Sequence, residues 1–237
     1  TLLAKYRSIR KFRSEPIAPE VLQDMLEAAS RASTCGNMQL YSLIVTQSRE
    51  LREALAPCHF NQPMVTQAPC VITVCADVHR FSMWCEQRDA EPCYDNFAWF
   101  LNGVTDALLA AQNLCVEAEA HGLGICYLGT TIYTAEEIAR ILDLPKGVIP
   151  VTTIVVGHPD ESPELTDRLP LDAVVHCEKY HHYTSSEIDE LWAEKETSEE
   201  TRRLLEENGL PNLAQIFTRN RYRAEDNLAI SRNYFAL

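Results

Sequence analysis

The sequence predicts a domain in which short strands alternate with helices, of the α/β or α+β class. Three runs, at residues 41–47, 70–77 and 151–159, are short, apolar and rich in β-branched residues, as buried strands are. Two further segments, 17–33 and 95–122, repeat apolar residues at helical spacing. A chain of 237 residues with 46% hydrophobic residues can form one large core or two small ones.

The first helix is predicted over residues 17–33. Pro19 is tolerated in a first helical turn, and Val21 and Met25 recur on one face, followed by Ala28 and Ala29. This pattern predicts an amphipathic helix that packs against the strands.

The longest helix is predicted over residues 95–122 and ends at Gly122. Val104, Leu108 and Ala111 repeat at helical spacing, and apolar residues also occupy most of the remaining circumference. A helix that is apolar nearly all round is buried in a large core or against another subunit. Since a chain of this size has few places to bury such a helix, we expect a homodimer.

The last part of the chain differs in composition. Residues 134–147 predict a short surface helix with a Thr cap and two Glu in the first turn. The segment 184–237 is charged, helical in pattern and poor in core residues. We therefore predict a core over residues 1–183 and a helical C-terminal arm over 184–237, which packs on the core or on a partner subunit.

The chain is acidic, with 21 Lys and Arg against 34 Asp and Glu, a net charge of −13. This balance argues against a nucleic-acid partner, which favours a dominant basic face. Four cations nevertheless cluster near the start, at Lys5, Arg7, Arg10 and Lys11. The cluster is either a solvated surface or a site for one small anionic ligand.

Several classes of protein are disfavoured. No run approaches the ~20 apolar residues of a membrane span, and the first residues lack the apolar core of a signal peptide, so we expect a cytoplasmic protein with no membrane partner. Nine Cys without a CxxC pair suggest buried, reduced thiols, with a zinc site at His79, Cys85 and Cys93 as the alternative. The motifs of Rossmann and Walker-type nucleotide sites are absent.

Three further stretches carry polar or glycine-rich patterns. Residues 31–42 combine small donors with one Gly between the first helix and the first strand; the alternative is an ordinary polar loop. Residues 122–130 contain three Gly, which suit either a ligand or a helix end followed by a strand. Residues 157–170 place Arg168 in a Pro-containing loop, where it binds a phosphate or is simply exposed.

Together these stretches resemble one family. R-S-I-R before F-x-x-x-P-I, then S/T-x-G-N-x-Q, then G-L-G-x-x-Y-L-G, then G-x-P-x-x-x-P…R-L-P follow one another over residues 5–170. This order resembles the FMN-dependent nitroreductase family, and within it the larger NADPH-dependent nitroreductases and flavin reductases. The resemblance implies an α+β fold, with a mixed central sheet surrounded by helices, in an intertwined homodimer. The helix 95–122 would lie at the dimer core and FMN at the subunit interface.

The resemblance also implies roles for the cations. Arg7, Ser8 and Arg168 would hold the phosphate and ribityl chain of FMN, and Arg10 would face the N1–O2 edge of the ring. The related branch often carries Lys where this chain has Thr166. Because Lys is a point charge and Thr offers only a hydroxyl, we expect either weaker FMN binding or compensation by another cation of the cluster.

The remaining residues implied by the resemblance approach the flavin ring from three segments. The partner chain would supply Thr34, Asn37 and Gln39. Gln62 would meet the pyrimidine edge. The backbone of Leu128, Gly129 and Thr130 would approach N5.

The resemblance implies an NAD(P)H-dependent oxidoreductase that reduces nitroaromatics, quinones or free flavin by ping-pong hydride transfer. The flavin makes and breaks the bonds, so no side chain is named as catalytic. The basic stretch 219–223 meets the 2′-phosphate of NADPH or is an exposed helix face. Two alternatives are a specialised, dehalogenase-like flavin enzyme and a protein that stores or senses flavin.

Overall fold

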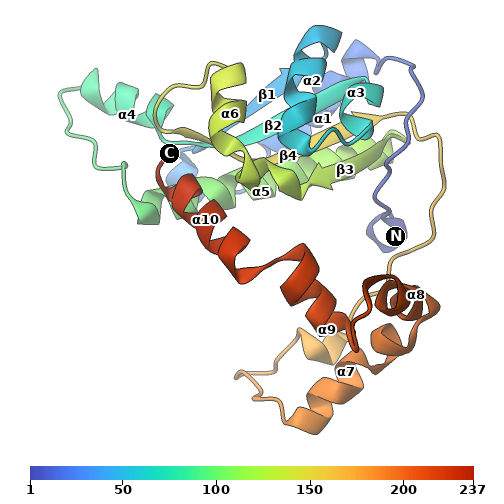
Figure 1. Cartoon of the computed structure of the whole chain (residues 1–237). Coiled ribbons are helices and arrows are strands. Elements are labelled where there is room, and N and C mark those ends of the chain that lie inside the picture. Colours follow the sequence, from blue (N-terminus) through green and yellow to red (C-terminus); the bar gives the residue numbers. More distant parts are fainter. The chain divides into compact units, whose positions relative to one another are not determined.

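The computed structural model describes residues 1–237, which fall into two units (Figure 1). Residues 1–165 and 233–237 form the first unit, and residues 166–232 form the second. The division predicted from composition at residue 183 remains a prediction.

The first unit is built on a four-stranded sheet. Its strands are β1 (Tyr41–Thr46), β2 (Cys70–Asp77), β3 (Gly124–Leu128) and β4 (Val148–Gly157), in the order β1-β2-β4-β3. All neighbouring strands are antiparallel, and a parallel pairing occurs at an isolated bridge between Ser8 and Ile125. The three strands predicted from apolar runs are confirmed. The glycine-rich stretch 122–130, for which a strand was one of two interpretations, contains β3.

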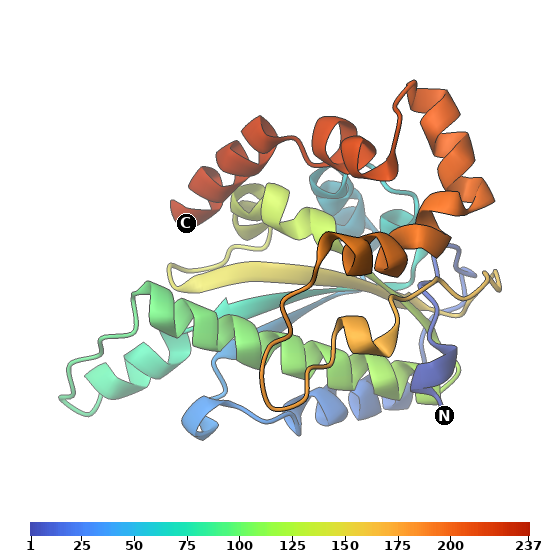
Figure 2. The ribbon, with the colours of Figure 1, turned by 90° about the horizontal axis from the view of Figure 1, so that it is seen from below.

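Helices cover both faces of this sheet. The helices α1 (Pro19–Ser30) and α5 (Phe97–Ala120) lie side by side on one face (Figure 2). There Ile72, Val74 and Ile154 point into the main hydrophobic cluster. On the other face, Val71 and Val155 pack with α3 (Met64–Gln67), beside α2 (Arg49–Leu55) and α6 (Ala135–Ile141) (Figure 1). Alternate strand residues therefore serve two separate cores.

The helix α5 is the longest element, and its first turn is capped by Asn96, whose side chain accepts from the Trp99 amide. The inner face of α5 is made of small and medium residues that are fully or almost fully buried: Ala107, Ala110, Ala111, Leu114, Cys115 and Ala118. Its outer face leaves Leu101 51% and Leu108 43% exposed. The predicted all-round burial is therefore not reached within one chain.

The second unit is helical, as the charged pattern predicted. It contains α7 (Ser185–Thr197), α8 (Glu199–Asn208), α9 (Leu213–Ile216), a π-helical turn at Phe217–Arg221 and the start of α10 (Ala224–Phe235). A capping box begins α7: the Thr184 hydroxyl accepts from the Glu187 amide, and the Glu187 carboxylate accepts from the Thr184 amide.

All nine cysteines are free, but they are not all buried. Cys35, Cys93 and Cys177 are exposed, so the expectation of buried thiols is wrong for these three. They lie in loops or short turns outside the main helices and strands. No three His, Cys, Asp or Glu side chains are grouped to hold a metal, and no helix is long and apolar enough to cross a membrane.

A buried carboxylate of α5 holds the loop between α1 and β1. Asp106 is 1% exposed, and its two carboxylate oxygens accept from the Cys35 amide at 2.9 Å and the Leu40 amide at 3.1 Å. Between these anchors Asn37 and Gln39 adopt left-handed backbone conformations, with φ of 56° and 55°. Such conformations are costly for residues with a side chain and persist where surrounding contacts impose them.

We expect Asp106→Ala to lower the free energy of unfolding by about 3 kcal/mol, because the amides of Cys35 and Leu40 lose their charged acceptor. Urea denaturation would measure the effect. The neighbouring Thr105→Ala, on the exposed side of α5, should change stability by less than about 0.5 kcal/mol. Equal stabilities of the two variants would show that the carboxylate does not anchor the loop.

Candidate functional site

Three segments that carry predicted site residues share one hydrophobic cluster beside β3. The N-terminal segment contributes Ile9, the region around α3 contributes Met64, and β3 itself contributes Cys126 and Leu128. These segments are far apart in sequence, so their polar residues come together only because their apolar neighbours pack into one cluster.

The N-terminal segment lies along β3. The Ile9 amide donates to the Ile125 carbonyl at 2.9 Å, and Ile9 is buried while Arg10 is exposed. A side chain at Gly124 would place its Cβ 2.6 Å from Ile9. The branched Ile9 side chain therefore packs so closely on β3 that position 124 requires glycine.

The two arginines of this segment have guanidinium N–H groups without a hydrogen-bond acceptor. Arg7 donates through Nη1 to the Lys5 carbonyl at 3.0 Å, but its buried Nε has no partner. The guanidinium of Arg10 makes no hydrogen bond or ion pair, while the amides of Arg10 and Lys11 donate to Glu161 Oε1 at 2.6 and 3.2 Å. Glu161 thus anchors the backbone at Arg10 and Lys11, and the guanidinium of Arg10 remains available to an anion.

The turn after β3 presents open backbone. Leu128 and Thr130 are buried and Gly129 between them is exposed, with no atom within 4 Å of the place where a Cβ would stand. The Thr131 hydroxyl bonds to the Leu128 carbonyl and to the Thr153 hydroxyl, each at 3.0 Å. The hydroxyl of Thr131 therefore fixes this turn to β4, and there is free space beside Gly129.

A second turn brings Gln62 to the same region. Phe60 and Asn61 are left-handed, with φ of 55° and 54°, and the Gln62 amide donates to the His59 carbonyl at 3.1 Å. The His59 side chain is fully buried, and its Nδ1 lies 2.8 Å from the Thr130 hydroxyl oxygen. His59 therefore ties the turn that carries Gln62 to the turn that carries Thr130.

Burial lowers the pKa of His59 to about 4. The imidazole is therefore neutral at pH 7. Its second nitrogen, Nε2, is buried and has no partner.

Thr34, Asn37 and Gln39 lie elsewhere in the chain. Their loop leads into β1, whereas Thr130 follows β3, and these strands are opposite edges of the sheet. The two edges are roughly 14 Å apart at the usual strand spacing. One chain thus holds the two halves of the predicted site on opposite sides.

Arg80, at the start of α4 (His79–Glu86), braces this loop. Its Nη2 donates to the carbonyls of Gln39 at 2.5 Å and Tyr41 at 3.1 Å, and its Nη1 pairs with the buried Asp77 at 3.1 Å. The loop that presents Asn37 and Gln39 is consequently fixed by two charged groups, Arg80 and the carboxylate in α5.

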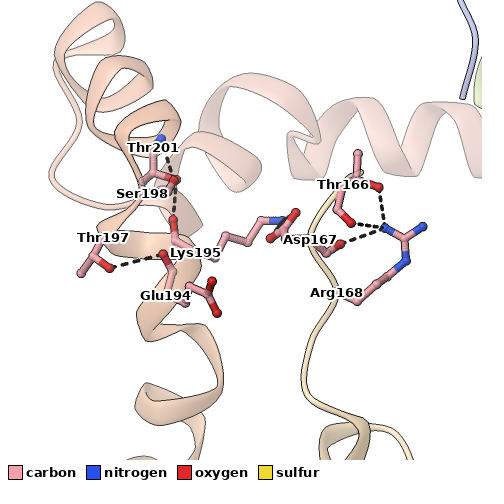
Figure 3. A network of polar contacts seen from close by, with 8 residues as sticks. All are labelled: Thr166, Asp167, Arg168, Glu194, Lys195, Thr197, Ser198 and Thr201. Carbon is pink, nitrogen blue, oxygen red and sulfur yellow. Dashed lines mark hydrogen bonds and ion pairs between the residues drawn. The ribbon is translucent and has the colours of Figure 1, made fainter. Parts of the chain in front are cut away.

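Arg168 belongs to the second unit and is exposed. Figure 3 shows its guanidinium turned onto its own loop, where Nη1 donates to the Thr166 hydroxyl at 2.6 Å and the Asp167 carbonyl at 2.8 Å. The Asp167 carboxylate in turn pairs with Lys195 of α7 at 3.0 Å (Figure 3). The Thr166 hydroxyl thus orients Arg168.

Three supporting residues were not predicted from the sequence. Asp106 could have been found from the sequence, since it is a charged residue on the inner face of an otherwise apolar helix. No sequence pattern pointed to His59 or Arg80, because their partners are 71 and up to 41 residues away in the chain.

Known proteins resemble this chain in sequence and in fold. The model of the nitroreductase family matches residues 3–158. An NADPH-dependent oxidoreductase of Staphylococcus aureus is 35% identical over 184 residues, which are 76% of this chain and 73% of that protein.

Two solved structures align over almost the entire chain. One, from Bacteroides fragilis, is a protein whose assignment as an oxidoreductase is provisional; it is 48% identical with a TM-score of 0.97, over 99% of this chain and 96% of its own. The other is the NADPH:FMN oxidoreductase of Vibrio harveyi in complex with NAD+, which is 26% identical with a TM-score of 0.79, over 98% of this chain and 96% of its own.

We expect His59 to make the protein less stable in acid. The folded protein protonates His59 only near pH 4, whereas an unfolded chain does so near pH 6.5. Unfolding therefore takes up a proton between these values, and the free energy of unfolding falls as the pH is lowered through them, by up to about 3 kcal/mol. Urea denaturation from pH 7.5 to 4 would measure this slope.

The control is His59→Phe, which has no titrating group. Its free energy of unfolding should depend less steeply on pH over the same window. The number of protons that it takes up on unfolding should be smaller by up to one. An identical slope in both proteins would mean that His59 titrates normally in the folded chain.

Proposed function

The chain belongs to the nitroreductase family, and we propose that it binds FMN and uses NAD(P)H to reduce small acceptors such as nitroaromatics, quinones or free flavin. The oxidoreductase names of its relatives favour this activity over flavin storage or sensing. The free cysteines suit a reducing compartment, and we therefore place the protein in the cytoplasm.

The observation that carries the proposal is that two arginines beside β3 have guanidinium N–H groups without an acceptor. Arg7 has a buried Nε without an acceptor, and the guanidinium of Arg10 is unpaired. Two cations within four residues suit a ligand that carries a phosphate and an electron-rich ring, as FMN does. The free space at Gly129 allows a flat ring to approach the backbone.

Each residue then has a role in holding the cofactor. Arg7, Ser8 and Arg168 hold the phosphate and the ribityl chain. Arg10 faces the N1–O2 edge, where its charge stabilises negative charge on the ring. Gln62 bonds to the pyrimidine edge.

The turn after β3 completes this side of the site. The backbone of Leu128, Gly129 and Thr130 lies toward N5 of the ring. When bound, FMN supplies the hydride chemistry, accepting two electrons from NAD(P)H and passing them to the acceptor. The protein groups bind and orient, and none is needed as an acid or base.

A homodimer completes the site in this proposal. Thr34, Asn37 and Gln39 lie at the sheet edge opposite to Thr130, so a second copy supplies them. The outer face of α5, with Leu101 and Leu108 exposed, offers the apolar surface for that contact.

The first experiment is an absorption spectrum of the protein with added FMN, before and after NADPH. We expect retained flavin bands that bleach with NADPH and recover with menadione or a nitroaromatic. Absence of flavin binding would refute the proposal. Tight binding without bleaching by NADPH or NADH would instead favour a storage or sensing protein.

The matched variants for this titration are Arg168→Ala and Arg203→Ala, which remove the same charge from the same unit. We expect Arg168→Ala to weaken FMN binding roughly tenfold or more, because a charged partner of the phosphate is lost. Arg203, which pairs with Glu207 on the surface of α8, should be neutral. Equal affinities would remove Arg168 from the site.

We expect light scattering at micromolar concentration to give twice the mass of one chain. The double change Leu101→Glu and Leu108→Glu should yield monomers that also lose FMN, since charges would enter an apolar interface. The surface change Glu136→Lys in α6 is the control and should remain dimeric. A monomeric wild-type protein that binds FMN would overturn the shared site.

A further inference from the structure

The contact between His59 and Thr130 joins two turns that carry or precede predicted site residues, Thr130 itself and Gln62. His59 is fully buried in the 3-10 turn η3 (Ala56–His59), and Thr130 is in the turn η4 (Gly129–Tyr133). Their side chains meet at 2.8 Å, and Thr130 Oγ1 makes no other hydrogen bond.

Two more contacts hold these turns together. The Thr134 hydroxyl donates to the Cys58 carbonyl at 2.7 Å, and the rings of Phe60 and Tyr133 meet edge-on at 6.0 Å. These contacts of neighbouring residues hold the two turns, and with them His59 and Thr130, in place.

The tautomer of His59 follows from its unpartnered nitrogen. If Thr130 donated to Nδ1, the proton of the imidazole would sit on Nε2, which is buried without an acceptor. A buried N–H without a partner is rarer and more costly than an acceptor without one. The arrangement with the proton on Nδ1 leaves only a lone pair unsatisfied.

We propose that His59 is a positioning residue that donates from Nδ1 to the Thr130 hydroxyl, so that this hydroxyl keeps its own hydrogen to donate to the flavin ring. This inference rests on the proposed function. Since a hydroxyl has one hydrogen and two lone pairs, the bond from His59 uses a lone pair of Thr130 and leaves its hydrogen unspent. Thr130 then adds a side-chain donor to a turn whose predicted contribution was backbone alone.

The low pKa of His59 is consistent with this role, because a neutral imidazole keeps one bare nitrogen and one N–H through the physiological range.

The test pairs a disruptive with a conservative change at each position. His59→Leu and Thr130→Val remove the donor to the hydroxyl and the hydroxyl itself. His59→Asn keeps a side-chain amide near the place of Nδ1, and Thr130→Ser keeps the hydroxyl. Melting temperatures of all variants verify that each is folded.

Two properties of bound flavin are measured: the dissociation constant of FMN and the midpoint potential of the protein-bound flavin. We expect each disruptive variant to weaken FMN binding about 3- to 10-fold, the range of one hydrogen bond, and to raise the potential. N5 of the oxidised ring accepts a hydrogen bond, whereas N5 of the reduced ring carries its own hydrogen. A donor at this atom therefore stabilises the oxidised form more, and its loss raises the potential. The double variant should be no weaker than the weaker single variant, and both conservative variants should resemble the wild type.

Independent effects of His59→Leu and Thr130→Val, which multiply in the double variant, would overturn the proposal. So would an unchanged potential in a folded variant that binds FMN. Nitrogen-15 NMR of the histidine ring provides a readout without flavin: a proton on Nδ1 is expected, and a proton on Nε2 would refute the inference even if the enzyme is active. Failure of the wild type to bind FMN would instead refute the proposed function, together with the flavin role of Thr130.

Discussion

The packing of α5 against the sheet is the interaction on which the rest of this structure depends. Its inner face is lined by Ala, which allows the helix to approach closely, and at Gly103 a Cβ would lie 3.1 Å from both the Leu40 carbonyl and the Ala76 side chain. From this position the same helix delivers the carboxylate of Asp106 to the loop before β1. Core formation and the geometry of a predicted cofactor loop are therefore set by one element.

The opposite face of the sheet organises the other half of the candidate site. A hydrophobic cluster joins the N-terminal segment, the turn before α3 and the end of β3, and the polar residues between its members are left at the surface. Arg10 and Gln62 owe their positions to buried neighbours such as Ile9 and Met64. Any loss of packing there would displace the predicted cofactor contacts together, because all of them depend on the same cluster.

The elements with strong periodicity were predictable from the sequence, and those that depend on distant contacts were not. β2 and α5 were recognisable because apolar residues recur along them without interruption. The short helix α4 and the turn η3 have no such pattern, since they are stabilised by contacts with residues far away. The site motifs could be recognised by family resemblance, whereas their supports could not: the partner of His59 lies 71 residues away, and the burial of Asp106 depends on the loop that it binds.

The N-terminal segment also has a role outside the candidate site. β3 is an edge strand, and an exposed edge offers unpaired backbone groups to the strands of other molecules. Residues 8–9 occupy part of that edge, and they reach it because Gly124 has no side chain to keep Ile9 away. The contact that brings the arginines to β3 therefore also shields this edge from aggregation by strand addition. Solubility and cofactor binding are consequently linked through a single glycine.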